Sequence, residues 1–206
     1  MKNSATARGL VRLALVTAAA LAAATLWAHN RPEQGLLLDA QTWNDEVLAA
    51  SSEPWPEDGW YRLVASARGV DVRSVRPGER ARSPADALFF RLPGTALRQG
   101  VHASYLDDEV LQPVAGRGPA AGRFSLRVEQ ADAGVQYAIG YAGHRYTYLL
   151  GPRGASTSVR AVADLDGDAR PDFVVDTDDS TFLLLSSRAQ PGLNLPTAEL
   201  PAHGGC

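Results

Sequence analysis

From residue 60 onward, apolar and polar residues alternate along the chain in short runs. The runs 60–66 (WYRLVAS) and 70–75 (VDVRSV) flank Ala67-Arg68-Gly69 and predict a β-hairpin, and 87–92 (ALFFRL) predicts a strand that ends at Pro93-Gly94. Strict alternation is typical of strands with one buried face, whereas an amphipathic helix repeats about every 3.6 residues. The pattern therefore predicts β-structure in this region.

A second group of alternating runs begins at Phe124. Two aromatic-rich runs meet at Ala142-Gly143 and predict the clearest hairpin of the chain. One face of the first run is expected to carry Tyr137, Ile139 and Tyr141, and one face of the second Tyr146, Tyr148 and Leu150. Three further strands are expected in 157–163, 171–176 and 181–187, with an acidic turn at 176–179 between the last two.

These patterns predict an all-β or β-dominated fold, an antiparallel sandwich or barrel-like domain built from hairpins. We expect the β-rich domain to span 60–188. A linker at 29–59, with a short helix around 42–49, precedes it, and an irregular tail rich in Pro and Gly follows at 189–206.

The N-terminal segment has the layout of a secretory signal peptide. Residues 1–12 carry Lys2, Arg8 and Arg12 and no acidic residue, and 13–28 form an apolar run that ends at the small residue Ala28. An uncleaved membrane anchor is the alternative, although the run is shorter than the roughly 20 residues that span a bilayer. Both interpretations predict an exported protein, periplasmic or extracellular.

Composition changes this picture little. The chain has 206 residues, of which 45% are hydrophobic, and its formal net charge is -3. This mild acidity gives no reason to expect nucleic acid or an anionic membrane surface as a partner. The only cysteine, Cys206, excludes an intramolecular disulfide; it either forms an intermolecular bridge or has no role.

The strongest chemical signal is the segment 164–172, DLDGDARPD. Its carboxylates fall at positions one, three, five and nine, and Arg170 at position seven would offer its main-chain carbonyl. Calcium takes about six to eight oxygen ligands, which a curling loop with alternate carboxylates can supply. The sequence thus predicts a calcium (Ca2+) site with the ligands Asp164, Asp166, Asp168, Arg170 and Asp172. The alternatives are a solvated acidic turn and a different divalent ion.

This loop and the following Phe173-Val174-Val175 resemble the calcium loops of VCBS and FG-GAP repeats, which lie between two β-strands. The resemblance implies that Asp172 closes the site. The segment departs from the pattern of these loops at Ala169, where they usually have glycine because the backbone turns sharply. An EF-hand is not implied, since Val175 stands where its glutamate would be. The motif occurs once, which excludes a complete propeller.

The chain from 158 to 192 also resembles the C-terminal part of small exported bacterial proteins with no assigned activity. That resemblance implies that the protein is exported, but it implies no particular activity.

Enzyme signatures are absent from the sequence, including HExxH, GxSxG and SxxK. The four histidines are scattered, at His29, His102, His144 and His203, and only His102 lies near a run of acids, at 107–109. Six aromatic residues could line a carbohydrate-binding face, or pack within the sheets: Trp55, Trp60, Tyr61, Tyr141, Tyr146 and Tyr148.

The sequence thus favours an exported, calcium-stabilised β-domain that acts as a structural or interaction module of the cell envelope or exterior. Its partner would be a protein or a polysaccharide. The alternatives are an extracellular or periplasmic hydrolase with a scaffold calcium, and a carbohydrate-binding module.

Overall fold

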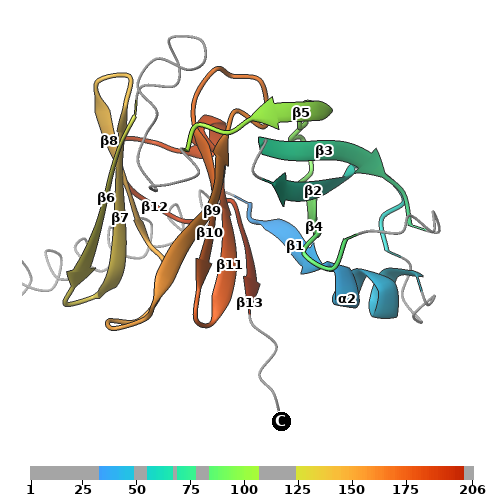
Figure 1. Ribbon diagram of the computed structural model, residues 1–206, viewed down its shortest axis with the longest axis horizontal. Coiled ribbons are helices and arrows are strands. Elements are labelled where there is room, and N and C mark those ends of the chain that lie inside the picture. The colour runs from blue at the N-terminus through green and yellow to red at the C-terminus, as the bar shows by residue number, and fades with distance from the viewer. Residues whose placement is uncertain (1–32, 49–54, 67–68, 78–83, 107–123, 202–206) are drawn as a thin grey trace, which may run out of the picture. The chain divides into compact units, whose positions relative to one another are not determined.

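A computed structural model describes residues 33–48, 55–66, 69–77, 84–106 and 124–201 (Figure 1). The predicted signal peptide or anchor lies outside the described residues, as do His29, the acidic run 107–109, His203 and Cys206. The chain divides into Met1–Glu33 and Gln34–Cys206, and the second unit is the subject below. Within the described ranges, no helix has the length and apolarity needed to cross a membrane.

A nine-stranded sheet forms the larger part of the described fold (Figure 1). Its strands, in spatial order, are β5 (Gly100–Ala103), β3 (Gly69–Val75), β2 (Trp60–Ser66), β4 (Leu88–Arg91), β1 (Gly35–Asp39), β13 (Ala198–Pro201), β11 (Ser180–Leu184), β10 (Asp172–Thr177) and β9 (Thr157–Ala163). All neighbours pair antiparallel except β1 and β13, which are parallel.

The two edges of this sheet approach one another and nearly close it into a barrel. The N–H of Tyr105, just after β5, donates to the carbonyl of Val162 in β9 at 2.8 Å. The N–H of Arg98, just before β5, donates to the carbonyl of Leu165 at 2.8 Å. Closure of this kind protects strand edges that would otherwise leave backbone groups unpaired.

A separate four-stranded sheet has the order β12 (Gly192–Asn194), β8 (His144–Leu149), β7 (Gly134–Tyr141) and β6 (Ser125–Ala131). The β7–β8 turn places Ala142 and Gly143 at φ 50° and 76°. Two successive positive φ angles are what a two-residue type I′ hairpin turn requires, and glycine favours them. The predicted hairpin at Ala142-Gly143 is confirmed.

Helical structure is confined to three short elements in the described ranges. The α-helix α2 (Ala40–Thr42) continues into a π-helix, η1 (Trp43–Leu48), and a 3-10 helix, η3 (Ser186–Arg188), follows β11. The side chain of Asp39 caps α2 by accepting the N–H of Thr42 at 2.6 Å, as N-cap residues do. Trp43 stacks on Phe89 of β4 with ring centroids 4.3 Å apart, which holds this helical segment against the outside of the sheet.

Alternation along β10 divides the interior into two cores. Phe173 and Val175 pack with the aromatic faces of β7 and β8, in the core between the two sheets. Val174, between them, packs with Leu183 inside the barrel-like sheet. Phe89 and Phe90 of β4 also point to opposite faces: Phe90 packs in the barrel interior, and Phe89 packs with the tryptophans of η1 and β2. Successive residues of a strand point to opposite faces, so β10 is buried on both sides.

The β-dominated fold predicted from the sequence is confirmed, with the strands 60–66, 157–163 and 172–177 in the expected places. Two boundaries were wrong. The expected linker 29–59 contains β1, because the short run Leu36-Leu37-Leu38 gave no periodicity that separates strand from helix. The expected irregular tail 189–206 contains β12 and β13, two strands of three and four residues whose pairing partners are distant in sequence.

The barrel core supplies a test of packing. Leu183 is fully buried, and its replacement in Leu183→Ala removes apolar contacts and leaves a cavity, which should lower the free energy of unfolding by about 2 to 5 kcal/mol. The same substitution at Leu193, 77% exposed on β12, should change it by about 0.5 kcal/mol or less. Urea denaturation followed by circular dichroism measures both, and equal losses in the two variants would contradict this core.

Candidate metal centre

The aspartate loop joins β9 to β10, and its last aspartate is also the first residue of β10. Asp172 is fully buried. Its Oδ2 accepts the N–H of Leu165 at 2.7 Å and its Oδ1 accepts the N–H of Ser186 at 2.7 Å. This carboxylate therefore connects the start of the loop to η3, 14 residues further along the chain.

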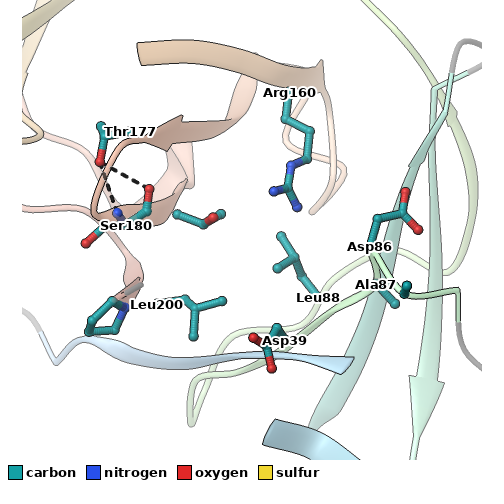
Figure 2. A pocket seen from close by; sticks show the side chains of 11 residues that line it. Asp39, Asp86, Ala87, Leu88, Arg160, Thr177, Ser180 and Leu200 are labelled. Carbon is teal, nitrogen blue, oxygen red and sulfur yellow. Dashed lines mark hydrogen bonds between the residues drawn. The ribbon is translucent and has the colours of Figure 1, made fainter. Parts of the chain in front are cut away.

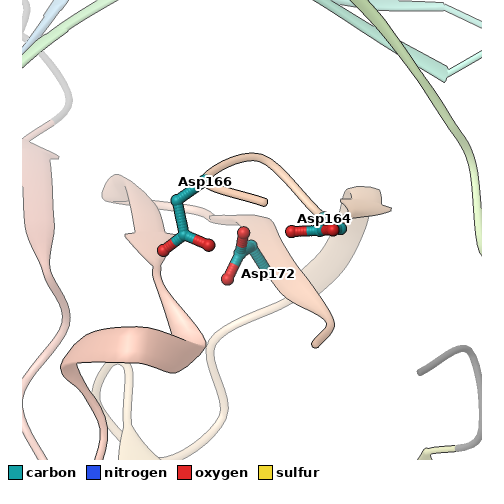
Figure 3. A group of neighbouring side chains, drawn as sticks. All are labelled: Asp164, Asp166 and Asp172. Carbon is teal, nitrogen blue, oxygen red and sulfur yellow. The ribbon is translucent and has the colours of Figure 1, made fainter. Parts of the chain in front are cut away.

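Asp164, Asp166 and Asp172 bring their carboxylates together (Figure 3). Each offers one oxygen, and these three oxygens lie within 4.8 Å of one another. Burial raises the pKa of the Asp172 carboxyl well above its usual range, and the charge of Asp166 raises it further. Hydrogen bonds from Ser186 and Leu165 offset part of this rise in pKa. The carboxylates thus form a concentrated negative charge next to a buried strand.

Hydrogen bonds within the loop hold these carboxylates in place. Asp164 accepts the N–H groups of Gly167 at 2.8 Å and Ala169 at 3.2 Å, through different oxygens. The Oδ1 of Asp166 accepts the N–H of Asp168 at 3.2 Å, and the hydroxyl of Ser187 donates to its Oδ2. Short polar side chains commonly bond to the backbone two or three residues on, which gives the turn its local order.

Asp168 lies outside the group of three. Its Oδ1 accepts the N–H of Arg170 at 2.8 Å, and the hydroxyl of Ser186 lies 3.2 and 3.1 Å from its two oxygens. Burial and, to a smaller degree, the charge of Asp166 raise the pKa of the Asp168 carboxyl. The side chain of Arg170 is half exposed, with its Nε 3.9 Å from the Oδ2 of Asp168.

Three residues beside the site were not expected from the sequence. Ser186 and Ser187 follow β11 in η3, and only their distance in sequence from the loop concealed them. Tyr105 packs in the core beside the loop, and its N–H pairs with β9. Burial raises the pKa of the Tyr105 phenol, and the charges of Asp164, Asp172 and Asp168 add to that rise. Nothing in the local sequence around Tyr105 signals this position.

The other predicted features lie apart from the cluster of Asp164, Asp166 and Asp172. Asp176 pairs with Arg160, and Asp178 accepts the N–H of Ser156 at 2.8 Å, so the acidic turn at 176–179 serves other contacts. The Nε2 of His102 is hydrogen-bonded to the carbonyl of Arg98, and His144 is exposed at the start of β8. Four of the six aromatic residues expected for a carbohydrate-binding face are buried. Tyr141, Tyr146 and Tyr148 lie in the core between the two sheets, and Trp60 packs with Trp43 and Phe89.

Comparison of the chain with protein-family models, with curated proteins and with solved structures found no match. The donors that the centre itself presents are all oxygens, from carboxylates and serine hydroxyls. Oxygen donors are the ligands that hard divalent cations prefer, whereas zinc and copper sites are usually built with His or Cys. The cluster Asp164, Asp166 and Asp172 could therefore hold a metal ion.

The backbone of the loop is strained at one residue. Ala169 has φ 65°, the left-handed region, and the preceding Gly167 has φ 83°. This is the position at which the loops that the segment resembles usually have glycine. An L-residue with a Cβ in that region loses about 1 to 2 kcal/mol relative to its preferred conformations.

Replacement of this alanine should stabilise the protein. Ala169→Gly relieves the strain but increases the entropy of the unfolded chain, so we expect a net gain of about 0.5 to 1 kcal/mol in the free energy of unfolding. Ala163→Gly is the matched control, because Ala163 is buried in β9 and the same change there should destabilise. Chemical denaturation of both variants gives the signs, and a loss of stability in Ala169→Gly would contradict the left-handed assignment.

Proposed function

We propose that the loop 164–172 binds calcium and clamps the β9–β10 hairpin. The observation that carries this proposal is the convergence of three carboxylate oxygens within 4.8 Å. Calcium binds oxygens at about 2.3 to 2.6 Å, so two ligands on opposite sides of the ion stand about 4.8 Å apart. Magnesium binds at about 2.1 Å, requires near-ideal octahedral geometry and retains several waters, so a loop that offers closely spaced carboxylates suits calcium better.

Further oxygens are needed to complete the six to eight that calcium takes. Asp168 and the carbonyl of Arg170 are the additional ligands expected from the spacing. Water molecules would supply the rest at the exposed side of the loop. The ion would offset the repulsion among the carboxylates and would fix the loop against η3, to which Asp172, Asp166 and Asp168 are already bonded.

The biological role that we propose is a structural or interaction module of the cell envelope or exterior. The basic and apolar N-terminal segment supports export, and calcium sites of extracellular modules bind at about 0.1 to 1 mM, a concentration available outside the cell. A cytosolic chain would meet too little free calcium to fill such a site. The partner of the module would be a protein or a polysaccharide.

Calcium binding predicts a selective rise in thermal stability. If the dissociation constant is about 0.1 mM, then calcium at about 1 mM stabilises the folded state by roughly 1.4 kcal/mol. For a domain of this size, that raises the unfolding temperature by about 3 to 6 °C relative to chelated protein. Differential scanning fluorimetry after chelation, then with calcium or magnesium at equal concentration, measures the rise.

Two variants locate the effect. Asp166→Ala should abolish the calcium-dependent rise, because it removes one of the three converging carboxylates. Asp132→Ala, at a fully exposed position outside the group, should retain it. A rise that survives in Asp166→Ala, or its absence from the unaltered protein, would mean that 164–172 is an acidic turn.

Export is tested separately. Expression in a bacterial host followed by fractionation and N-terminal sequencing should find a mature chain that begins at His29, outside the cytoplasm. Recovery of the intact chain in the membrane fraction would establish the anchor. Recovery of the chain from the cytosol alone would refute export in either form.

A further inference from the structure

A pocket of about 230 Å³ opens at one end of the barrel-like sheet (Figure 2). Leu88 and Leu200, which line it, also pack in or against the barrel core. Thr177 lines it as the last residue of β10, whereas Asp172 begins that strand at the metal centre. Five steps of about 3.3 Å along β10 place Thr177 about 17 Å from Asp172. The pocket is therefore distinct from the metal centre.

An irregularity in β9 brings a charged side chain to this pocket. Val174 of β10 is opposite Ala161, but Val175 is opposite Val159, so Arg160 has no partner across the ladder. Such a β-bulge bends the strand and redirects the side chain at the extra residue, and bulges recur beside binding sites. Ala161 belongs to the barrel core, and Arg160 next to it lines the pocket.

The guanidinium of Arg160 is held in a fixed orientation. Its Nε and Nη2 donate to the two carboxylate oxygens of Asp176, each at 2.8 Å, and Thr181 also donates to Asp176 at 2.7 Å. These two bonds use two of the five N–H donors that a guanidinium has. Arg160 lines the pocket, whereas Asp176 does not. A ligand in the pocket would therefore contact the remaining N–H donors of Arg160.

Acidic side chains stand elsewhere on the pocket wall. Asp39, at the end of β1, lies opposite Arg160 in Figure 2, and Asp86 lies to one side. Asp86 makes no hydrogen bond or ion pair with another residue of the described ranges. Leu88, Leu200 and Pro201 contribute an apolar surface between the charged groups. The pocket thus presents one cationic group, two anionic groups and a hydrophobic wall.

We propose that this pocket binds a small zwitterionic amino acid with an aliphatic side chain. The ligand carboxylate accepts hydrogen bonds from Arg160, its ammonium group faces Asp39 and Asp86, and its side chain packs on Leu88 and Leu200. A simple anion would face two carboxylates, and a simple cation would leave the remaining N–H donors of Arg160 without an acceptor, so a ligand with both charges matches the wall best. Mouths of β-barrels are common ligand sites, and this volume is below the roughly 300 to 1,000 Å³ of larger ligand pockets, which favours a small molecule.

Three probes with one carbon skeleton test the charge requirement. Isothermal titration calorimetry of the full chain with L-leucine, isoamylamine and 4-methylpentanoate compares the zwitterion with its amine and its carboxylate alone. We expect L-leucine to bind at least ten times more tightly than either of the other two. No detectable heat with millimolar L-leucine, or equal affinity for L-leucine and isoamylamine, would overturn the proposal.

Substitutions then assign the binding to this pocket. Asp86→Asn removes one negative charge without breaking a contact among the described residues, and Arg160→Met removes the guanidinium. Each should weaken L-leucine binding at least tenfold, while Arg127→Met, at an exposed position of β6, should leave it unchanged. Because Arg160→Met also leaves Asp176 without its ion-pair partner, Asp86→Asn is the decisive variant. L-leucine binding that is unaltered in Asp86→Asn would overturn the proposal.

Discussion

The fold depends on one buried carboxylate. Asp172 is fully enclosed, and its two oxygens accept backbone N–H groups from Leu165 in the loop and Ser186 after β11. Loss of the carboxylate would leave two buried donors without partners, each at a cost of about 1 to 3 kcal/mol. This residue begins the strand that contacts both cores, so the interaction that shapes the loop also fixes the position of β10.

The same carboxylate explains why the loop suits a cation. A buried Asp172 next to Asp166 favours the protonated form, which is the reason for its raised pKa. A bound divalent ion would stabilise the ionised form instead, because metal and proton compete for the same oxygens. Hydrogen bonds from η3 and from the loop backbone already hold the carboxylates close together. The strain at Ala169 is one cost of that arrangement.

Strand β10 positions different polar groups at its two ends. At its start the carboxylates of the loop converge, and at its end Asp176 orients Arg160 toward the pocket in the barrel mouth. Between them lie Phe173, Val174 and Val175, buried on alternating faces. The apolar middle provides a rigid support, so the polar groups at both ends are held by the same packing.

The sequence by itself determined the local structure. Alternation located β2, β3, β4 and the strands from β6 to β11, the aspartate spacing located the acidic cluster, and the missing glycine at 169 identified the strained position. Tertiary structure decided which strands pair. Alternation shows which residues of a strand share a face, but it does not show which strands pair. The short strands β1, β12 and β13 and their parallel pairings therefore could not be predicted. For the same reason Ser186, Tyr105 and the pocket at Arg160 emerged only from the fold, because each depends on contacts between segments far apart in the chain.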